Sequence, residues 1–443
     1  MRLSLRRGYA LEPVVLALVA ITALSFFSYI GPQDVSRLAL THALVFDRSV
    51  RIDRWESGTI DKAFRDGHFY TDKAPGMSFV AVPPLMAMTA VGSIDHETRE
   101  NGVWRKRSLV WILRLLTGGI AFVVAVFLVG RAAESLIQGT GAATASAFGL
   151  GTLVLPLAAT LFGHVAAATL GFASFVLVAS GLQTRHSYRW VVFAGLCGGL
   201  ALLVEYQAAL VAVVVFGYLA LLSVRHALAF AAALASGLVA LGAYNIAAFG
   251  SPLRMSYGYV AEERFVEHQR EGLFGIGIPA FDALRDVLVS EDGLVMQSPV
   301  LVLAAVGLGL LWHRGNRAEA AVCGLVPLLF LLVTAGYYDP FGGLSPGPRF
   351  FVPALPFLAV GLACAFARWR ILTLTATLVS VSATLYEAGT WAVPDDQAFT
   401  TFASLLGAPR QLGILTLCAT ALAAVLVANA AVLFRRSRVE QCR

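Results

Sequence analysis

The chain has 443 residues, of which 58% are hydrophobic and only 14% are charged. Ordinary soluble domains carry about 25% charged residues, so the composition excludes that class and favours membrane-spanning helices. The formal net charge is +6, but the Lys and Arg residues stand mostly at the ends of apolar runs, where they set orientation in the membrane. We therefore predict no nucleic-acid partner.

Motifs for disulfide, metal and nucleotide chemistry are missing from the sequence. No Walker A motif is present, so the sequence lacks the ATP-binding motif that an ATP-driven transporter requires. We interpret the cysteines as small core residues, because four lie in apolar runs and one stands beside the carboxyl terminus: Cys197, Cys323, Cys364, Cys418 and Cys442.

The apolar runs predict an all-α polytopic membrane protein with about 12 transmembrane helices. The first run is long and no clear A-x-A cleavage site follows it, so we expect a retained signal anchor. Residues 1–434 are expected to form one membrane domain, and the basic tail 435–443 is expected to be cytoplasmic. The predicted spans cover approximately residues 11–31, 108–130, 141–161, 164–182, 190–206, 208–223, 226–248, 294–312, 318–337, 350–367, 371–392 and 411–434.

Residues 77–92, which contain Pro83-Pro84, are predicted to form a short re-entrant or interfacial helix instead of a span. With that choice both termini are cytoplasmic, and so are the short basic connections between later spans, as the positive-inside rule requires. The basic segment 98–107 then lies on the outer face, against the same rule.

This topology gathers the long polar loops on the outer face of the membrane. They are the first outer loop 32–76, the second long loop 249–293, and the loops 337–349 and 393–410. Long structured loops on one face are where function usually concentrates.

The densest group of charges is DKAFRDGHFYTDKAPGMS, residues 61–78. Lys73 is suited to a phosphate oxygen, and Asp72 can hold either that lysine or a sugar hydroxyl. His68 and Tyr70 suit a polar ligand at an apolar boundary. A solvated turn at Asp66-Gly67 and Pro75-Gly76 is the alternative.

The beginning of this stretch receives a different interpretation. We expect Asp61, Lys62 and Arg65 to form the outer face of a short helix.

Other candidate residues stand at the mouths of spans. Asp34 can act as a general base for a hydroxyl or cap the following helix. Arg349 can bind phosphate or anchor its span at the interface. His164 and Glu205 are polar groups in apolar surroundings, which are often functional, although either can be a simple turn residue. Tyr257 is the better ligand-facing candidate in a loop whose charged residues look like a solvated helix face.

These residues resemble the GT-C superfamily, whose members transfer sugars from polyprenyl-phosphate carriers. The nearest patterns are those of the bacterial aminoarabinose transferases and the protein O-mannosyltransferases. Pro32-Gln33-Asp34 is similar to the proline-acid motif that opens their first loop, and GHFYTDKAPGMS, residues 67–78, is similar to its end. The resemblance is strongest over residues 11–90 and continues loosely through His164, residues 249–258 and the GGLSPGPR segment.

The resemblance implies a hexosyl or pentosyl transferase of the cell membrane with its active site on the extracytoplasmic face. It would move a sugar, with inversion, from a polyprenyl-phosphate carrier to a hydroxyl of a lipid, glycan or protein acceptor. By resemblance, Asp34 would be the catalytic base, and Lys73 with Arg349 would hold the donor phosphate. Asp72, His68 and Tyr70 would orient the sugar or the phosphate, with His164, Glu205 and Tyr257 as further candidates.

Three departures from the family pattern stand out. Gln33 replaces one acid of the opening motif, Ala74 replaces one of two prolines, and the region of His164 stands where the family has a second-loop acid. No cofactor is required by the sequence, and a divalent cation bound through the donor phosphate stays open.

Two other functions are weighed against the enzyme. A secondary transporter or flippase for a lipid-linked or anionic substrate would need groups near the bilayer midplane and usually repeated halves, and we find neither pattern. A non-catalytic scaffold of the envelope would not bring Asp34 and Lys73 together at a cavity.

Overall fold

The computed structural model describes residues 8–182, 187–391, 401, 404 and 407–440. Helices dominate these residues, and the two strands among them form one small sheet. Most of the predicted loop 393–410 lies outside the described residues, as do the last three residues of the predicted tail. The tail's residues 435–440 continue the last helix, α22.

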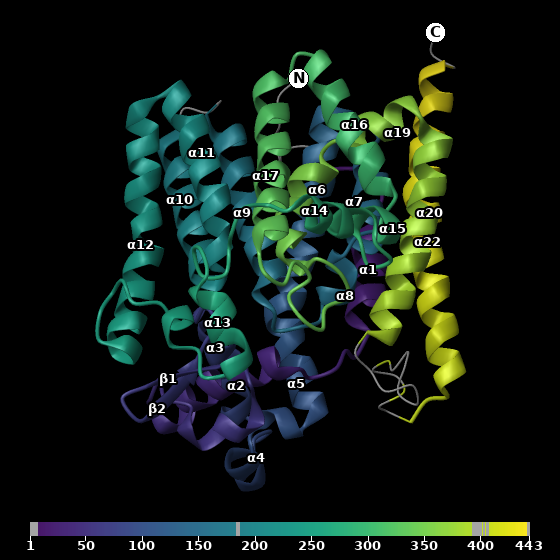
Figure 1. Ribbon diagram of the computed structural model, residues 1–443. Coiled ribbons are helices and arrows are strands. Elements are labelled where there is room, and N and C mark those ends of the chain that lie inside the picture. The colour runs from purple at the N-terminus through teal and green to yellow at the C-terminus, as the bar shows by residue number, and fades with distance from the viewer. Residues whose placement is uncertain (1–7, 183–186, 392–400, 402–403, 405–406, 441–443) are drawn as a thin grey trace.

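Figure 1 shows a bundle of helices with a polar lobe at its lower end. We define the polar lobe as residues 31–75 and 95–106. The bundle contains α1 Glu12–Leu24, α5 Arg107–Arg114, α6 Ile120–Leu136, α7 Gly141–Leu150, α8 Val154–Leu157, α9 Gly163–Gly181, α10 Ser187–Val204, α11 Ala209–Leu222, α12 Val224–Phe249, α15 Leu294–Gln297, α16 Val300–His313, α17 Arg317–Gly336, α18 Leu355–Ala359, α19 Leu362–Arg368, α20 Arg370–Thr390 and α22 Arg410–Glu440.

Seven helices in the described part of the chain are long and apolar enough to cross a membrane, or up to nine if each bent pair is one span. The predicted number of about 12 spans is therefore not confirmed. Helix α1 has only 13 residues, and the predicted span 141–161 divides into the short helices α7 and α8. The predicted spans 294–312 and 350–367 belong to helix pairs bent by 91° and 52°.

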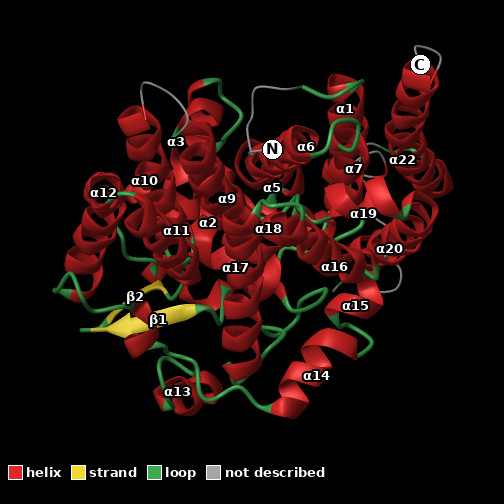
Figure 2. Cartoon of the chain, turned by 90° about the horizontal axis from the view of Figure 1, so that it is seen from above, coloured by secondary structure: helices red, strands yellow, loops and turns green. Residues whose placement is uncertain are grey.

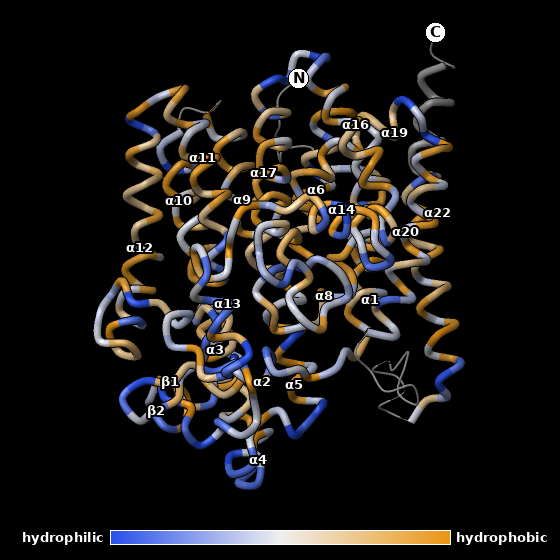
Figure 3. Tube along the Cα trace, in the orientation of Figure 1, coloured by the Kyte–Doolittle hydropathy of each residue, from blue (hydrophilic) through white to orange (hydrophobic). Residues whose placement is uncertain are grey.

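The polar lobe is built on a β-hairpin and short helices, and it carries much of the hydrophilic colour in Figure 3. Strands β1 and β2 pair antiparallel, with Lys62 opposite Thr71 and Arg65 opposite His68. The elements of the lobe are α2 Pro32–His42, η1 Ala43–Asp47, η2 Asp53–Gly58, β1 Lys62–Arg65, β2 His68–Thr71, α4 His96–Asn101 and η3 Val103–Arg105.

The short helix predicted at Asp61, Lys62 and Arg65 is wrong, because the segment from Lys62 forms strand β1. The physical reason is the turn that follows. Asp66 and Gly67 both adopt positive φ, 50° and 81°, which is the backbone of a tight two-residue hairpin and a common use of an Asp-Gly pair.

Helix α3, Gly76–Ala90, has 15 residues and corresponds to the segment predicted not to cross. The chain on both of its sides lies in the polar lobe. Arg54 before α3 donates to Glu100 after it at 2.7 Å, and the rings of Trp55 and Trp104 lie 4.7 Å apart. Gly76 allows α3 to begin against α10, since a Cβ there would lie 2.5 Å from the carbonyl oxygen of Leu203.

The second long loop connects the polar lobe with the segment after α17. It contains α13 Glu263–Arg270 and α14 Phe281–Val289, and Figure 2 shows α13 beside the hairpin. The Ala261 N–H donates to the Lys62 carbonyl at 3.0 Å, and the Gly277 N–H donates to the Gly336 carbonyl at 2.7 Å. Three loops that are far apart in the sequence therefore meet at one place.

Candidate active site

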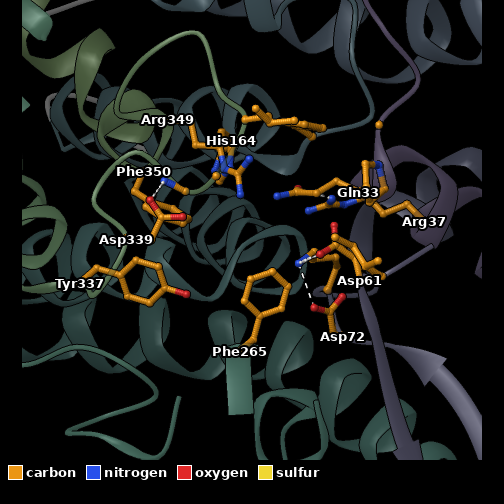
Figure 4. A pocket seen from close by; sticks show the side chains of 18 of the residues that line it. Gln33, Arg37, Asp61, Asp72, His164, Phe265, Tyr337, Asp339, Arg349 and Phe350 are labelled. Atoms are coloured by element: carbon orange, nitrogen blue, oxygen red, sulfur yellow. Dashed lines mark hydrogen bonds and ion pairs between the residues drawn. The ribbon is translucent and has the colours of Figure 1, made fainter. Parts of the chain in front are cut away.

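A cavity of about 330 Å³ opens where these loops meet the first turn of α9. Polar and charged side chains from the polar lobe form one wall, and aromatic side chains from the later loops form much of the other (Figure 4). The lining residues include Gln33, Arg37, Asp61, Asp72, Lys73, Phe162, His164, Glu205, Tyr257, Arg264, Phe265, Tyr337, Tyr338, Asp339, Arg349, Phe350 and Trp391.

Arg37 is a buried cation whose charge is matched by Glu205. Its guanidinium donates to the Glu205 carboxylate at 2.9 Å and to the Gln33 side-chain oxygen at 2.8 Å. Gln33 and Arg37 are four residues apart on α2, so they lie on the same face of that helix. Burial raises the pKa of the Glu205 carboxyl above its ordinary value, and Arg37 opposes this shift. The pair brings no net charge to the wall.

Lys73 lies between two carboxylates. Its Nζ is 3.1 Å from Asp61 Oδ1 and 2.9 Å from Asp72 Oδ2. Burial alone would lower the pKa of Lys73, but Asp61 and Asp72 outweigh burial and the pKa is raised. Burial raises the pKa of the Asp72 carboxyl to about 6, although Lys73 pulls it down. The lysine is therefore protonated, and its charge is already matched by carboxylates.

Arg349 differs from the other two cations. It starts the short helix η7, Arg349–Ala354, and its guanidinium lies 5.3 Å from the ring centres of both Phe162 and Phe350. The residue is 8% exposed. Within the described ranges, no carboxylate forms an ion pair with it, and its Nε has no hydrogen-bond partner. Arg349 is a buried cation at the cavity wall, and the carboxylates of Asp61, Glu205 and Asp339 act on it only from beyond ion-pair distance.

His164 stands in the first turn of α9, close to the same arginine. Its Nδ1 is 3.9 Å from Glu205 Oε1, which is too long for a hydrogen bond. Neither ring nitrogen has a hydrogen-bond partner among the described residues. The ring meets Phe350 edge-on, with 5.7 Å between centroids. His164 is a buried side chain with unused hydrogen-bonding capacity.

The opposite wall is aromatic. Tyr337 and Phe350 pack edge to face with 5.0 Å between ring centres, and Tyr257 packs edge to face against Tyr206 at 5.4 Å. Such a wall presents flat apolar surface and a few hydroxyl groups, which is typical of a pocket that orients an organic ligand.

Asp34 is not among the lining residues of the cavity. Its Oδ2 accepts from Arg114 at 2.8 Å, and its Oδ1 accepts from the Leu161 N–H at 2.9 Å. It also accepts from the Gly31 N–H at the start of α2, at 3.4 Å, which is a capping contact. Asp34 and Lys73 therefore do not line one cavity, whereas Lys73 and Arg349 do.

Two further predicted residues also lie outside the lining. His68 on β2 contacts Asp53 at 2.8 Å, and Tyr70 is buried against Phe249 with 5.5 Å between ring centres. The structure brings the remaining predicted residues together at the cavity: Asp72, Lys73, His164, Glu205, Tyr257 and Arg349.

Sequence reasoning missed Asp61, Gln33 and Arg37 as cavity residues. The signal for Asp61 was the Asp66-Gly67 turn, because a hairpin closed there pairs Lys62 with Thr71 and so brings Asp61 beside Asp72. In the described part of the chain, no group of three or more His, Cys, Asp or Glu side chains is arranged to hold a metal ion.

The architecture is that of the GT-C glycosyltransferases, a class of polytopic membrane proteins, and the predicted GT-C fold is confirmed. Among solved structures, the chain is similar to ArnT from Cupriavidus metallidurans in the apo state. The TM-score is 0.53 and the identity 14%, over 95% of this chain and 75% of that one. The same protein bound to undecaprenyl phosphate gives a TM-score of 0.52 at 15% identity, over 95% and 76% of the two chains.

A second similar protein is the archaeal oligosaccharyltransferase AglB from Archaeoglobus fulgidus, in complex with an inhibitory peptide and a dolichol-phosphate. Its TM-score is 0.51 at 11% identity, over 95% of this chain and 55% of that one. This chain therefore spans about half the length of AglB. No family model and no curated protein matches the sequence, so the fold is what the comparisons establish.

Proposed function

We propose that the protein is a membrane glycosyltransferase that takes a hexose or pentose from a polyprenyl-phosphate carrier. The sugar would pass, with inversion, to a hydroxyl of a lipid, glycan or protein of the cell envelope, on the extracytoplasmic face. The observation that carries this proposal is the guanidinium of Arg349, whose Nε has no hydrogen-bond partner among the described residues, in a cavity between apolar helices and polar loops.

A buried guanidinium with an unused N–H donor is costly, so an acceptor group of a ligand at Arg349 would be favoured. A guanidinium binds phosphate oxygens through charge-assisted hydrogen bonds, and the rings of Phe162 and Phe350 fix its position. A polyprenyl phosphate supplies both the anion and an apolar tail that a membrane bundle can accommodate. ArnT and AglB, which share the fold, are known in complexes with undecaprenyl phosphate and with a dolichol-phosphate.

In this proposal each candidate residue has a distinct role. Arg349 stabilises the phosphate as it leaves, and Lys73 on the facing wall holds Asp61 and Asp72 in place. His164, Glu205 and Tyr257 orient the sugar. Asp34 supports the site indirectly, because its contacts hold the start of α2, the helix that carries Gln33 and Arg37.

The test is undecaprenyl phosphate binding to the purified full chain in nanodiscs, followed by native mass spectrometry or thermophoresis. Arg349→Ala should weaken binding by about 10-fold to 100-fold, because a hydrogen bond to a charged group contributes roughly 1.5–3 kcal/mol. Arg349→Lys should lose less, since the charge remains.

The control is Arg285→Ala, which removes an exposed arginine paired with Asp286 on α14. It should leave undecaprenyl phosphate binding unchanged. Wild-type affinity in Arg349→Ala would contradict the proposed phosphate site.

A further inference from the structure

Transfer to a hydroxyl needs a group that removes the hydroxyl proton as the oxygen attacks the anomeric carbon. Four carboxylates line the cavity and are candidates for this role, namely Asp61, Asp72, Glu205 and Asp339. The group must be ionised, must reach the cavity and must have a free oxygen.

Three of the four are unsuitable in this arrangement. Glu205 accepts from the Arg37 guanidinium at 2.9 Å and also from the Gly163 backbone. The free oxygen of Asp72, Oδ1, is covered by protein. Asp339 lies on the same side of the cavity as Arg349 in Figure 4, which is the side of the leaving phosphate.

Asp61 meets the requirements of access and of a free oxygen. It lines the cavity, and its side chain keeps 11% exposure. Lys73 binds Oδ1 at 3.1 Å, so a cation lies beside the carboxylate. No hydrogen bond to Oδ2 occurs among the described residues, so this oxygen is available to a ligand.

The position of Asp61 also fits the stereochemistry. Inversion requires the attacking hydroxyl and the leaving phosphate to lie on opposite sides of the anomeric carbon. Figure 4 shows Asp61 on the wall of the polar lobe and Arg349 across the cavity from it. A phosphate at Arg349 would therefore leave on one side while a hydroxyl at Asp61 attacks from the other.

We propose that Asp61 is the general base of the reaction, an assignment that rests on the proposed glycosyl transfer. The hydroxyl oxygen forms a bond to the anomeric carbon as its proton passes to Asp61 Oδ2. The bond between the anomeric carbon and the phosphate oxygen breaks, and the polyprenyl phosphate leaves with the electron pair beside Arg349. Lys73 is a positioning residue that turns Oδ2 toward the cavity and still pairs with Asp72 after Asp61 is protonated.

The experiment compares a nucleophile that needs a base with one that does not. Radiolabelled undecaprenyl-phosphate-linked arabinose, mannose and glucose are each offered to the full chain in nanodiscs, with water or with sodium azide as acceptor. Azide carries its own negative charge, so it attacks the anomeric carbon without losing a proton. The variants are Asp61→Ala, Arg349→Ala and the control Asp66→Asn, at the hairpin tip, where the carboxylate is 77% exposed.

We expect Asp61→Ala to lower the rate of transfer to water by about 100-fold to 10,000-fold, the usual contribution of a general base. Azide should restore release of undecaprenyl phosphate and give an inverted glycosyl azide. Undecaprenyl phosphate binding should stay at the wild-type value. Azide should not rescue Arg349→Ala, because that variant lacks stabilisation of the leaving group, and Asp66→Asn should behave as wild type.

Two results would overturn the assignment of Asp61 alone. One is wild-type transfer to water by Asp61→Ala while Arg349→Ala is impaired. The other is an Asp61→Ala protein that azide does not rescue although the wild type accepts azide. If the wild type neither binds undecaprenyl phosphate nor releases it from any of the three donors, the proposed function fails and the base assignment fails with it.

Discussion

Two of the ion-pair arrangements that involve residues of the first loop differ in one decisive respect. Asp34 and Arg114 have side chains that are 1% and 0% exposed, and both oxygens of Asp34 are occupied. Asp61, Lys73 and Asp72 form the second arrangement, which lines the cavity. We refer to them as the closed pair and the open cluster.

The comparison separates the acid at the expected place in the motif from the acid that lines the cavity. Arg114 donates to the carbonyl oxygens of Ser28 and Tyr29 as well as to Asp34, so the closed pair fastens the end of the first predicted span to α5. A carboxylate used in this way contributes to the fold. In our proposal the proton passes instead to the accessible carboxylate of the open cluster.

Breaking the closed pair should have the largest effect on folding. Asp34→Asn leaves the guanidinium of Arg114 buried without a carboxylate, which costs about 3–5 kcal/mol. The melting temperature and the folded fraction in detergent should fall sharply, while Asp66→Asn should change neither. A variant that kept its melting temperature but lost glycosyl transfer would instead return the role of base to Asp34.

The open cluster should make stability depend on pH through Asp72. The pKa of Asp72 is about 6 in the folded protein and 3.8 ordinarily, so the folded state binds the proton more tightly between these values. The contribution of Asp72 to stability therefore falls as pH rises from about 4 to 6, by on the order of 3 kcal/mol at most.

Asp72→Asn removes this titration. The melting temperature of the variant minus that of the wild type should be more positive at pH 7 than at pH 4. A difference that stays constant across this range would mean that folding does not shift the pKa of Asp72.

A smaller effect is expected from Gly76→Ala, which displaces the segment after Lys73 without touching the closed pair. The new methyl group would lie 2.5 Å from the Leu203 carbonyl oxygen, and overpacking of this kind costs about 1–3 kcal/mol. Both the melting temperature and undecaprenyl phosphate affinity should decrease.

The matched control for this variant is Gly217→Ala on α11. A methyl group there meets no atom within 4 Å, so stability should stay constant or rise by up to about 1 kcal/mol. Equal behaviour of the two variants would show that the start of α3 can move away from α10 without cost.

Much of the architecture could be predicted from the lengths of the apolar runs and the positions of the charged residues. The apolar runs identified the bundle, and the polar loops identified the end at which the cavity lies. The length of an apolar run does not reveal where the chain changes direction within it. The chain bends by 91° between Gln297 and Val300, at Ser298-Pro299, where we predicted one continuous span over residues 294–312.

The candidate site could be predicted only in part, because some of its contacts join residues that are far apart in the sequence. Lys73 and Asp72 are neighbours in the sequence, so their association was expected. The partner of Asp34 lies 80 positions away, and nothing in the sequence around Asp34 indicates that Arg114 would bind its carboxylate. Asp61 was misassigned because the local charges were interpreted as a helix, although the Asp66-Gly67 turn indicated a hairpin.

The main-chain contact between β1 and the second long loop has a consequence for how substrate preference can change. Ala63 pairs with Val260, and the Ala261 N–H donates to the Lys62 carbonyl at 3.0 Å. The spacing between the polar and aromatic sides is thus set partly by peptide groups, which every amino acid possesses. Under the proposed function, substitution of Tyr257, Phe265 or Tyr337 would change which sugar is accepted, while these main-chain contacts would preserve the width of the cavity.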